Sequence, residues 1–285
     1  MMNITGDFTA AVVGLGLIGG SMAKALKEYV GCKVLGYDID EDVMQKALLT
    51  GAVDGWLDEE SLGSVDFTVV VLYPGDTIKY IKDNAPYFKK GSVVIDCCGI
   101  KRTICRAVEP VSLENGFIFV GAHPMAGTEQ FGFDNSFPEM FVGASLVVTP
   151  YSWTTPETLD FISDMAKRLR FGRTQISTPE KHDRLISYTS QLAHVVSCAY
   201  VGSPSAPDFR GFSAGSFQDM TRVAKLNENM WSEIFIDNKD FLTHEVDSLV
   251  QRLNEINDAI KSEDFETLRG YLREARILKE KISSK

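Results

Sequence analysis

The feature that most constrains the fold is a glycine-rich turn between an apolar run and a helical pattern. Three glycines spaced as Gly-x-Gly-x-x-Gly follow the apolar run 8–13 and lead into a helical pattern over 21–29. In this context the first glycine permits a tight turn, the second lets a pyrophosphate approach the backbone, and the third lets helix and strand pack closely. The helix N-terminus then receives the phosphates. The cofactor-binding residues predicted from this turn are Gly14, Leu15, Gly16, Leu17, Ile18 and Gly19.

A carboxylate at the end of the next apolar run supports a dinucleotide site. The run Lys33–Tyr37 ends at Asp38, which lies 22 residues past Gly16. An acidic residue at this place accepts hydrogen bonds from the ribose hydroxyls and repels the extra phosphate of NADP. The glycine motif alone is weak, because a mobile loop can contain it, and Asp38 could merely end a strand. Together the two features favour nucleotide binding and predict NAD as the cofactor.

Short apolar runs alternate with amphipathic segments of helical length from Phe8 to Thr149. This alternation is typical of an α/β fold, a Rossmann-type doubly wound parallel sheet with helices on both faces. Pro156 begins a predicted helix to Leu169, Arg173–Ser177 is a candidate edge strand, and strand patterns then stop. The other expected strands are Phe8–Val13, Lys33–Tyr37, Phe67–Leu72, Ser92–Cys97, Phe117–Gly121 and Ala144–Thr149.

The sequence therefore predicts a dinucleotide-binding domain over 1–177 and an all-helical domain for substrate binding and dimerisation over 178–285. Segment 185–207 contains no Lys, Arg, Asp or Glu, yet its polar residues recur on one helical face. Solvated faces usually carry charges, so this face is expected to border a buried polar cavity. Farther along, an apolar seam predicts packing against a partner helix, within the chain or across a homodimer. The polar face contains Ser187, Ser190, Gln191, His194, Ser197 and Cys198, and the seam contains Leu242, Val246, Leu249, Leu253, Ile256 and Ile260.

The composition argues against several classes of partner. The chain has 29 Lys and Arg against 39 Asp and Glu, and the resulting net charge of −10 disfavours nucleic acids and anionic membranes. A small-molecule substrate is favoured, and it can itself be an acid where local basic groups capture it. The N-terminus lacks a basic stretch followed by an apolar core, so the expected location is the cytoplasm. Five cysteines without paired spacing predict reduced thiols and no metal site.

The segment Gly121–Glu129 follows a predicted strand and contains His123. Loops that leave the C-terminal ends of parallel strands line the ligand crevice of such folds. A histidine has an unperturbed pKa of about 6.5, so His123 could take the proton of an alcohol while hydride leaves the same carbon. We therefore predict that His123 is catalytic. Thr128 and Glu129 are expected at the mouth of the pocket, although Glu129 could equally be solvated.

Motifs along nearly the whole chain resemble the prephenate dehydrogenases of tyrosine biosynthesis. Besides the glycine turn they are His123-Pro-Met-Ala-Gly-Thr-Glu129, Thr178-Pro-Glu-Lys-His-Asp183, Ser190-Gln-Leu-Ala-His194 and Phe217-Gln-Asp-Met-Thr-Arg222. The resemblance implies an oxidative decarboxylation of prephenate to 4-hydroxyphenylpyruvate, in which NAD+ takes a hydride and the ring carboxylate leaves as CO2. It also implies that His123 accepts the hydroxyl proton, that Arg222 binds a substrate carboxylate, and that His194 lines the same pocket.

The chemistry of Arg222 agrees with this implied role, because a guanidinium offers a planar fork for a carboxylate and prephenate carries two carboxylates. Asp219 lies three residues earlier on the same helical face and could hold the guanidinium, unless the two merely form an exposed ion pair. Leu72 and Gly99 complete the predicted cofactor-binding set.

Two positions depart from the family pattern. The family's serine after the fifth strand is replaced by Gly99, and a backbone amide, a water or Cys98 could substitute for its hydroxyl. Gln191 stands where many members have histidine, which could alter recognition of the side chain that distinguishes prephenate from arogenate. We predict a structural role for His182 and a place in the core for Trp231.

Three alternatives remain at this point. An arogenate dehydrogenase would give tyrosine directly. A β-hydroxyacid dehydrogenase would use a catalytic lysine, which the polar face around His194 lacks. A non-catalytic NAD-binding regulator would keep the fold without turnover.

Overall fold

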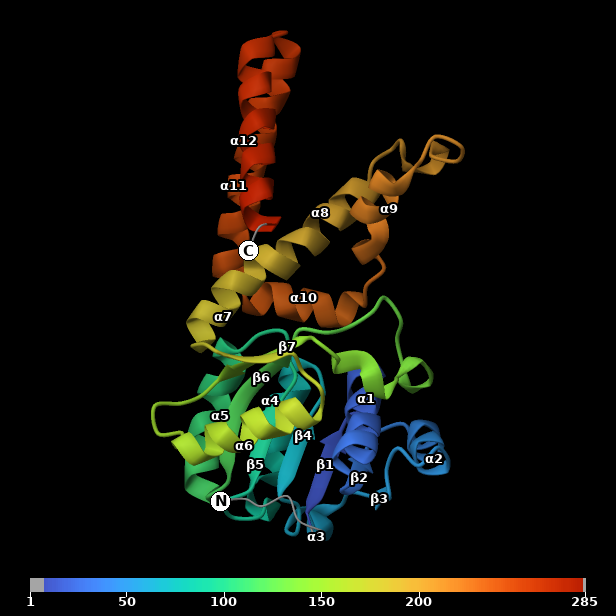
Figure 1. The fold of residues 1–285 in the computed structure, drawn as a ribbon, viewed down its shortest axis with the longest axis vertical. Coiled ribbons are helices and arrows are strands. Elements are labelled where there is room, and N and C mark those ends of the chain that lie inside the picture. Colours follow the sequence, from blue (N-terminus) through green and yellow to red (C-terminus); the bar gives the residue numbers. More distant parts are fainter. Residues whose placement is uncertain (1–7, 284–285) are drawn as a thin grey trace. The chain divides into compact units, whose positions relative to one another are not determined.

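The computed structural model describes residues 8–283, in which residues up to Asn238 form one compact unit and residues from Lys239 form a second. The first unit contains an eight-stranded sheet in the order β3-β2-β1-β4-β5-β6-β7-β8 (Figure 1). All neighbouring strands are parallel except β6 and β7. The strands are β1 Thr9–Val13, β2 Lys33–Tyr37, β3 Gly55–Trp56, β4 Phe67–Val70, β5 Val93–Asp96, β6 Ile118–Pro124, β7 Ser145–Thr149 and β8 Arg173–Ile176.

The predicted α/β fold is confirmed, and the strand order reverses between β1 and β4, where ligands bind in doubly wound sheets. The antiparallel β7 was not predicted, because a strand's sequence pattern carries no direction. The connection from Pro124 to Ser145 holds only short 3-10 turns, so β7 starts at the edge where β6 ends. Pairing with β7 also extends β6. His123 therefore lies near the end of this strand, opposite Val147, and not in the loop that we predicted.

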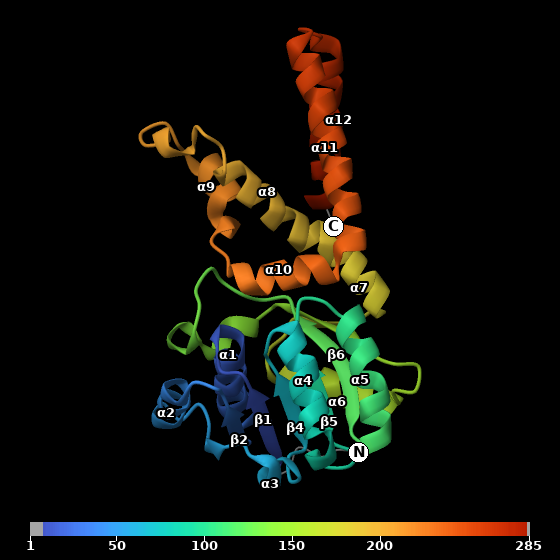
Figure 2. The same cartoon turned by 180° about the vertical axis from the view of Figure 1, so that it is seen from behind.

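Helices cover both faces of the sheet, as Figures 1 and 2 show from opposite sides. Successive strand residues alternate between two apolar clusters, with Ala10 and Val12 in one and Ala11 and Val13 in the other. Both faces are therefore buried, which explains why the strands are continuous apolar runs. On the first face lie α1 Leu17–Ala25, α2 Glu41–Leu49 and α6 Pro156–Arg168, and on the second lie α3 Glu59–Leu62, α4 Pro74–Asn84 and α5 Arg102–Asn115.

Helices α7 to α10 complete the first unit. The side chain of Thr178 caps α7 by accepting a hydrogen bond from the Lys181 amide, and Pro179 occupies the first helical position. Ile234 of α10 packs into the second apolar cluster, which joins this helix to the loop after β5. The elements are α7 Pro179–Ile186, a π-helical turn Ser187–Gln191, α8 Leu192–Val201, α9 Gly215–Thr221 and α10 Glu228–Asp237.

The second unit is a pair of helices, α11 Lys239–Lys261 and α12 Phe265–Ser283. The Tyr271 hydroxyl donates to Glu255 Oε2 at 2.7 Å and joins them. In the predicted apolar seam of α11, Leu242 is buried and Val246, Leu249 and Ile256 are half-buried, whereas Leu253 and Ile260 are exposed. Among residues 8–283 no helix has the length and hydropathy needed to cross a bilayer.

The sheet ends at Ile176, directly before the predicted boundary between residues 177 and 178. Compactness instead divides the chain after Asn238, because α7 and α10 contact the loops at the ends of the strands. The boundary at 177 and 178 remains a prediction.

Candidate functional site

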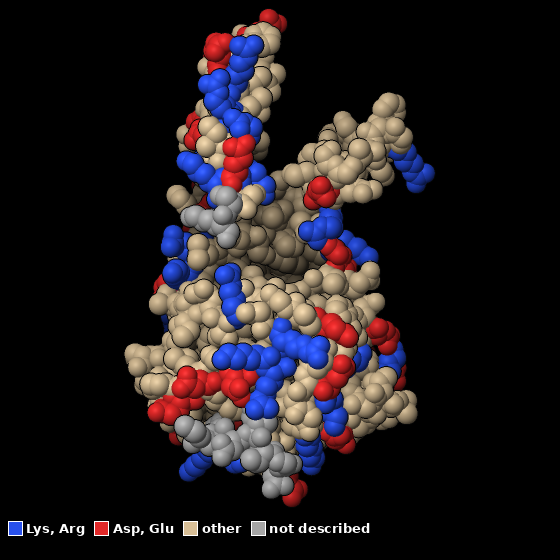
Figure 3. Space-filling view, viewed as in Figure 1, with Lys and Arg blue, Asp and Glu red and all other residues tan. Residues whose placement is uncertain are grey.

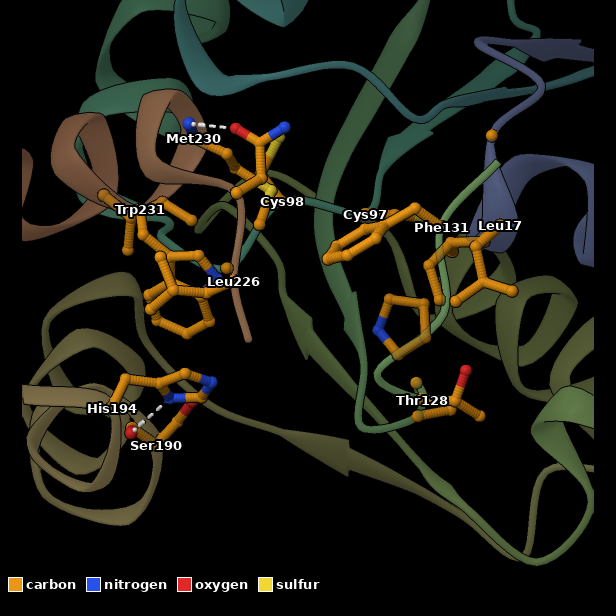
Figure 4. Close-up of a pocket in the computed structure, with 18 of the residues that line it drawn as sticks. Leu17, Cys97, Cys98, Thr128, Phe131, Ser190, His194, Leu226, Met230 and Trp231 are labelled. Atoms are coloured by element: carbon orange, nitrogen blue, oxygen red, sulfur yellow. Dashed lines mark hydrogen bonds between the residues drawn. The ribbon is translucent and has the colours of Figure 1, made fainter. Parts of the chain in front are cut away.

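A cavity of about 610 Å³ lies in the first unit, where the C-terminal ends of β1, β4, β5 and β6 face α8 and α10 (Figure 4). Its volume is within the range of small-molecule and cofactor sites. Most of the predicted site residues contribute to its wall. They are Gly16, Leu17, Ile18, Leu72, Gly99, His123, Thr128, Glu129, Gln191, His194 and Arg222.

The glycine turn has the geometry of a pyrophosphate site. Gly14 has a φ of +85°, and a Cβ there would meet the carbonyl oxygen of Val71. A Cβ at Gly19 would meet the carbonyl of Gly14, so helix and strand can approach only because no side chain is present. At Gly16 a Cβ would meet nothing within 4 Å, and no side chain caps the N-terminus of α1. Open space in front of free helical N–H groups therefore suits the phosphates of a dinucleotide.

Four residues of the predicted cofactor set do not line the cavity. Leu15 is fully buried, and neither it nor Gly14 nor Gly19 lines the cavity. Asp38 is also outside the lining, but its Oδ2 accepts a hydrogen bond from the Leu15 amide at 2.7 Å. This contact holds a half-buried carboxylate beside the turn, which is where a ribose-binding carboxylate is required.

His123 is the half-buried first member of a hydrogen-bonded series whose other members, His182 and Asp183, are buried. Its Nδ1 lies 2.9 Å from Nε2 of His182, whose Nδ1 lies 2.7 Å from Oδ1 of Asp183. The Asp183 carboxylate also accepts hydrogen bonds from the main-chain amides of Lys101 and Arg102, at 2.7 and 2.9 Å. Burial raises the pKa of Asp183, but the hydrogen bonds from His182 and these amides outweigh it and keep that pKa below its ordinary value.

This series fixes which nitrogen of His123 carries the proton. Because the Asp183 carboxylate can only accept, His182 donates through Nδ1 and its Nε2 is an acceptor. His123 must therefore donate through Nδ1, which leaves its Nε2 without a proton. Burial, then the charges of His182 and Lys101, hold the pKa of His123 well below 6.5. The arrangement makes His123 a neutral base with a free Nε2 at neutral pH.

His182 was predicted to have a structural role, and its contact with His123 adds a second one, the orientation of the predicted base. The only sequence signal was its place beside Asp183 in the Thr178–Asp183 motif. Sequence spacing could not supply the partner, since His123 lies 59 residues away. The contact arises because α7 packs its first turn against the loop after β5.

A buried ion pair lies next to the His123 end of the cavity. Asp96 and Lys101 contact each other with both side chains fully buried. Asp96 also accepts hydrogen bonds from the amides of Cys98 and Ala122, both at 3.0 Å. Burial lowers the pKa of Lys101, but the Asp96 carboxylate outweighs it and the net shift is upward, so the amine stays charged. The pair ties the loop after β5 to β6, and so to His123.

The position of the missing family serine lies directly beside His123. A Cβ on Gly99 would be 4.0 Å from Cε1 of His123 and 3.6 Å from Cδ1 of Ile234, both ordinary contacts. Cys98 was one candidate to replace the serine, and it lines the cavity. Its sulfur lies 3.3 Å from the Thr77 hydroxyl and 3.3 Å from the Leu72 carbonyl oxygen, so the thiol hydrogen-bonds to these two groups.

The other end of the cavity is an exposed ion pair. Arg222 Nη1 contacts Glu129 Oε1, with 62% and 36% of their side chains exposed. The hydrogen bond from Arg222 lowers the pKa of Glu129, and nearby Lys225 contributes. The predicted pair between Asp219 and Arg222 is wrong within the described residues. The helix α9 ends at Thr221, so Arg222 starts a 3-10 turn and Asp219 is left exposed outside the cavity.

Between the two ends the cavity has flat apolar walls. The rings of His194 and Trp231 stack with centroids 3.7 Å apart and an interplanar angle of 27°. Figure 4 places this stack on one side of the cavity and Leu17 and Phe131 on the other. Nδ1 of His194 donates to the Ser190 carbonyl at 2.9 Å, and burial lowers the pKa of this ring.

The predicted polar face of the central helix is confirmed as a cavity wall at Ser190, Gln191 and His194. Trp231, predicted in the core, is half-buried and lines the cavity as well. Other lining residues were missed, because apolar residues after strands or on α10 carry no distinctive pattern. They include Tyr73, Met125, Phe131, Leu226 and Met230.

Comparison with protein families gives two matches, which together span most of the chain. The model described as prephenate dehydrogenase, nucleotide-binding domain, matches residues 22–171. The model described as prephenate dehydrogenase, dimerization domain, matches residues 178–274. The resemblance seen in the motifs is thereby confirmed, and so is a nucleotide site in the sheet domain.

Similar proteins cover nearly the whole chain. The cyclohexadienyl dehydrogenase of Zymomonas mobilis is 30% identical over 276 residues, which are 93% of each chain. The structure of prephenate dehydrogenase from A. aeolicus in complex with hydroxyphenyl propionate and NAD+ has a TM-score of 0.86 and 28% identity, and the match covers 96% of this chain and 98% of that one. Synechocystis arogenate dehydrogenase has a TM-score of 0.80 and 25% identity, over 96% and 100%.

Proposed function

Since the chain belongs to the prephenate dehydrogenase family, we propose that it oxidises prephenate with NAD+ and releases CO2, giving 4-hydroxyphenylpyruvate. The observation that carries the proposal is the free Nε2 of a neutral, half-buried His123 at the edge of a cavity that also holds the glycine turn. Family membership does not favour the β-hydroxyacid dehydrogenase alternative. A regulator without turnover would not need a base of fixed protonation.

In the proposed reaction the hydroxyl of the ring donates its proton to Nε2 of His123. NAD+ held at the glycine turn would supply the acceptor for the hydride on the ring carbon that bears the hydroxyl. The C–O bond becomes a carbonyl, the bond between ring and carboxylate breaks with loss of CO2, and its electrons enter the ring, which becomes a phenolate. The phenolate oxygen then takes the proton back from Nε2 of His123, which leaves a phenol and a neutral imidazole. His182 and the Asp183 carboxylate stabilise the imidazolium as it forms, in the way that a carboxylate supports histidine in hydrolase triads.

The exposed end of the cavity supplies a cation for a substrate carboxylate. Arg222 is already paired with Glu129, so an incoming carboxylate exchanges with Glu129 on the guanidinium. Lys225 adds a second positive charge to the same wall. His123 and Arg222 lie at opposite ends of the cavity. The hydroxyl and the ring carboxylate of prephenate are likewise at opposite positions of its ring, so each can reach its own partner.

Arogenate is the second candidate substrate, because Glu129 at the mouth could receive its ammonium group once Arg222 holds a carboxylate. The test is NADH absorbance with each substrate in turn, at equal NAD+. We expect kcat/KM for prephenate to exceed that for arogenate. A larger kcat/KM for arogenate would make arogenate the substrate. If NAD+ binds but neither substrate yields NADH, the non-catalytic regulator would be favoured.

We further propose that the protein is a homodimer through its C-terminal helices. The surface over α8 and α9 carries few charged side chains (Figure 3), and large apolar residues are exposed there. Examples are Tyr188, Tyr200, Val201 and Phe212. Such exposed patches on a water-facing surface mark contacts with another chain. Light scattering after size exclusion is expected to give twice the chain mass of 31.6 kDa, and a monomer at micromolar concentration would contradict the proposal.

A further inference from the structure

The side chain of Gln191 has an unused hydrogen-bond donor at the wall of the cavity. It is 0% exposed and lines the cavity, yet its Nε2 has no acceptor among the described residues. Buried polar groups nearly always have a partner, and an amide nitrogen offers two hydrogens. The unpaired donor therefore indicates an acceptor on a ligand.

The orientation of this amide is fixed by its neighbour Asn238. Oδ1 of Asn238 accepts from Arg102 Nη2 at 2.9 Å, and Nδ2 of Asn238 donates to the Asp183 carbonyl at 2.9 Å. A guanidinium can only donate and a carbonyl can only accept, so Asn238 cannot be turned over. Its Nδ2 also donates to Oε1 of Gln191 at 2.8 Å. The oxygen of Gln191 must face Asn238, and the nitrogen is left for the ligand.

Two routes, both through Asn238, connect Gln191 to the His123 end of the cavity. Asn238 bonds to the main chain of Asp183, whose carboxylate holds the His182 ring against His123. One helical turn before Asn238, Ile234 lies against the position of Gly99, which itself adjoins His123.

The exposed anion-binding pair lies at the other end of the cavity. His194 is one turn farther along the helix than Gln191, and its pKa is lowered by burial and, to a smaller extent, by the charge of Arg222. Gln191 therefore belongs to the end of the cavity where the hydroxyl of the substrate is oxidised.

We propose that Gln191 is a further catalytic residue, whose Nε2 donates a hydrogen bond to the ring oxygen while that oxygen gives its proton to His123. This inference rests on the proposed oxidation of a cyclohexadienol. Negative charge builds up on the oxygen as the O–H bond breaks, and a fixed donor aimed at such an oxygen stabilises the transition state. The side-chain amide of Gln191 thus supplies the hydrogen bond to the substrate oxygen that a serine in place of Gly99 could have made. It does not discriminate between the side chains of prephenate and arogenate, which lie at the opposite end of the ring.

The first test replaces Gln191 by methionine, which keeps the shape of the side chain and removes the donor. Asn238 keeps its hydrogen bond to the Asp183 carbonyl oxygen. We expect kcat to fall about 100-fold on prephenate and by the same factor on any arogenate turnover, with KM little changed. Unchanged kcat, or a loss on only one of the two substrates, would overturn the proposal, since the second result assigns Gln191 to the side chain.

The matched rescue is Gly99→Ser in the Gln191→Met background. The space beside Gly99 accepts a Cβ, so the added hydroxyl can donate to the same oxygen. At least tenfold recovery of kcat is expected. If Gln191→Met does not fold, Gln191→Glu keeps the bond to Asn238 and presents an acceptor in place of the donor. That variant is expected to lose kcat to a similar extent, and full activity would overturn the proposal.

A binding measurement separates this inference from the proposed function, because it needs no turnover. Calorimetry compares 4-hydroxyphenylpropionate with 3-phenylpropionate, in the presence of NAD+. The wild type is expected to prefer the hydroxylated ligand, and Gln191→Met to reduce that preference about 5-fold. An unchanged preference would overturn the role of Gln191 even if prephenate is a substrate. A reduced preference without turnover would contradict only the proposed reaction.

Discussion

The two ends of the cavity are built in opposite ways. At the His123 end the carboxylates of Asp96 and Asp183 are buried and accept several hydrogen bonds each, and Lys101 is buried against Asp96. At the other end Arg222 and Glu129 form one exposed contact. A buried charge is costly to disturb, whereas an exposed ion pair contributes at most about 1 kcal/mol and is screened by salt. The comparison teaches that the buried end can fix a protonation state, while the exposed end can exchange its partner for a substrate.

The largest effect is expected from His123→Asn, which removes the proposed base from the buried end. The loss in kcat should be about 10³-fold to 10⁴-fold, because general base catalysis contributes roughly that much at its upper range. Steady-state NADH production measures it, and calorimetry checks that NAD+ still binds. A variant with a tenth of the wild-type kcat would show that the base is another group.

Lys101→Met breaks the ion pair below His123 and leaves the Asp96 carboxylate buried without its cation. We expect the free energy of unfolding in urea to fall by about 3 to 5 kcal/mol. The matched control is Lys79→Met, which removes a lysine from the exposed pair with Asp83 and should cost no more than about 0.5 kcal/mol. Equal losses in the two variants would remove the distinction between buried and exposed pairs.

Asp183→Asn tests whether the series of hydrogen bonds sets the tautomer of His123. An amide can donate to His182 as well as accept, so the proton of His123 is free to move to Nε2. A loss of about 100-fold to 1000-fold in kcat is expected, with a smaller effect on KM. Asp164→Asn on the exposed face of α6 is the control for the same chemical change. Retention of kcat in Asp183→Asn would mean that the tautomer does not depend on this carboxylate.

The smallest effect is expected at the exposed end. Arg222→Ala should raise KM for prephenate about 10-fold and change kcat by less than about 3-fold, since the guanidinium holds an anion remote from the reacting carbon. Arg168→Ala, from an exposed pair with Asp164 on α6, is the control and should leave both constants unchanged. A fall in kcat larger than the rise in KM would give Arg222 a part in the chemical step.

Local sequence patterns predicted the sheet well and the site only in part. The strand Lys33–Tyr37 was predicted to the residue, because both faces are buried and the run is bounded by polar residues. The two-residue β3 and the direction of β7 depend on neighbours and were not predicted. The contact of His123 with His182 joins positions 59 apart, and no spacing rule could supply it. Motifs named the residue types of the site, but the pairing of Arg222 with Glu129 instead of Asp219 required the end of α9.

The most direct test of His123 as a neutral base is NMR of the ring nitrogens in protein labelled with ¹⁵N-histidine. The protein is titrated with pH in the presence of NAD+ and 4-hydroxyphenylpropionate. The chain has four histidines, and the His123→Asn variant assigns the signal. Burial lowers the pKa of His123 below 6.5, so we predict a neutral ring with its proton on Nδ1 at neutral pH, and protonation of Nε2, with loss of activity, only below pH 6.5. A proton on Nε2 at neutral pH, or a positively charged ring above pH 6.5, would contradict the account.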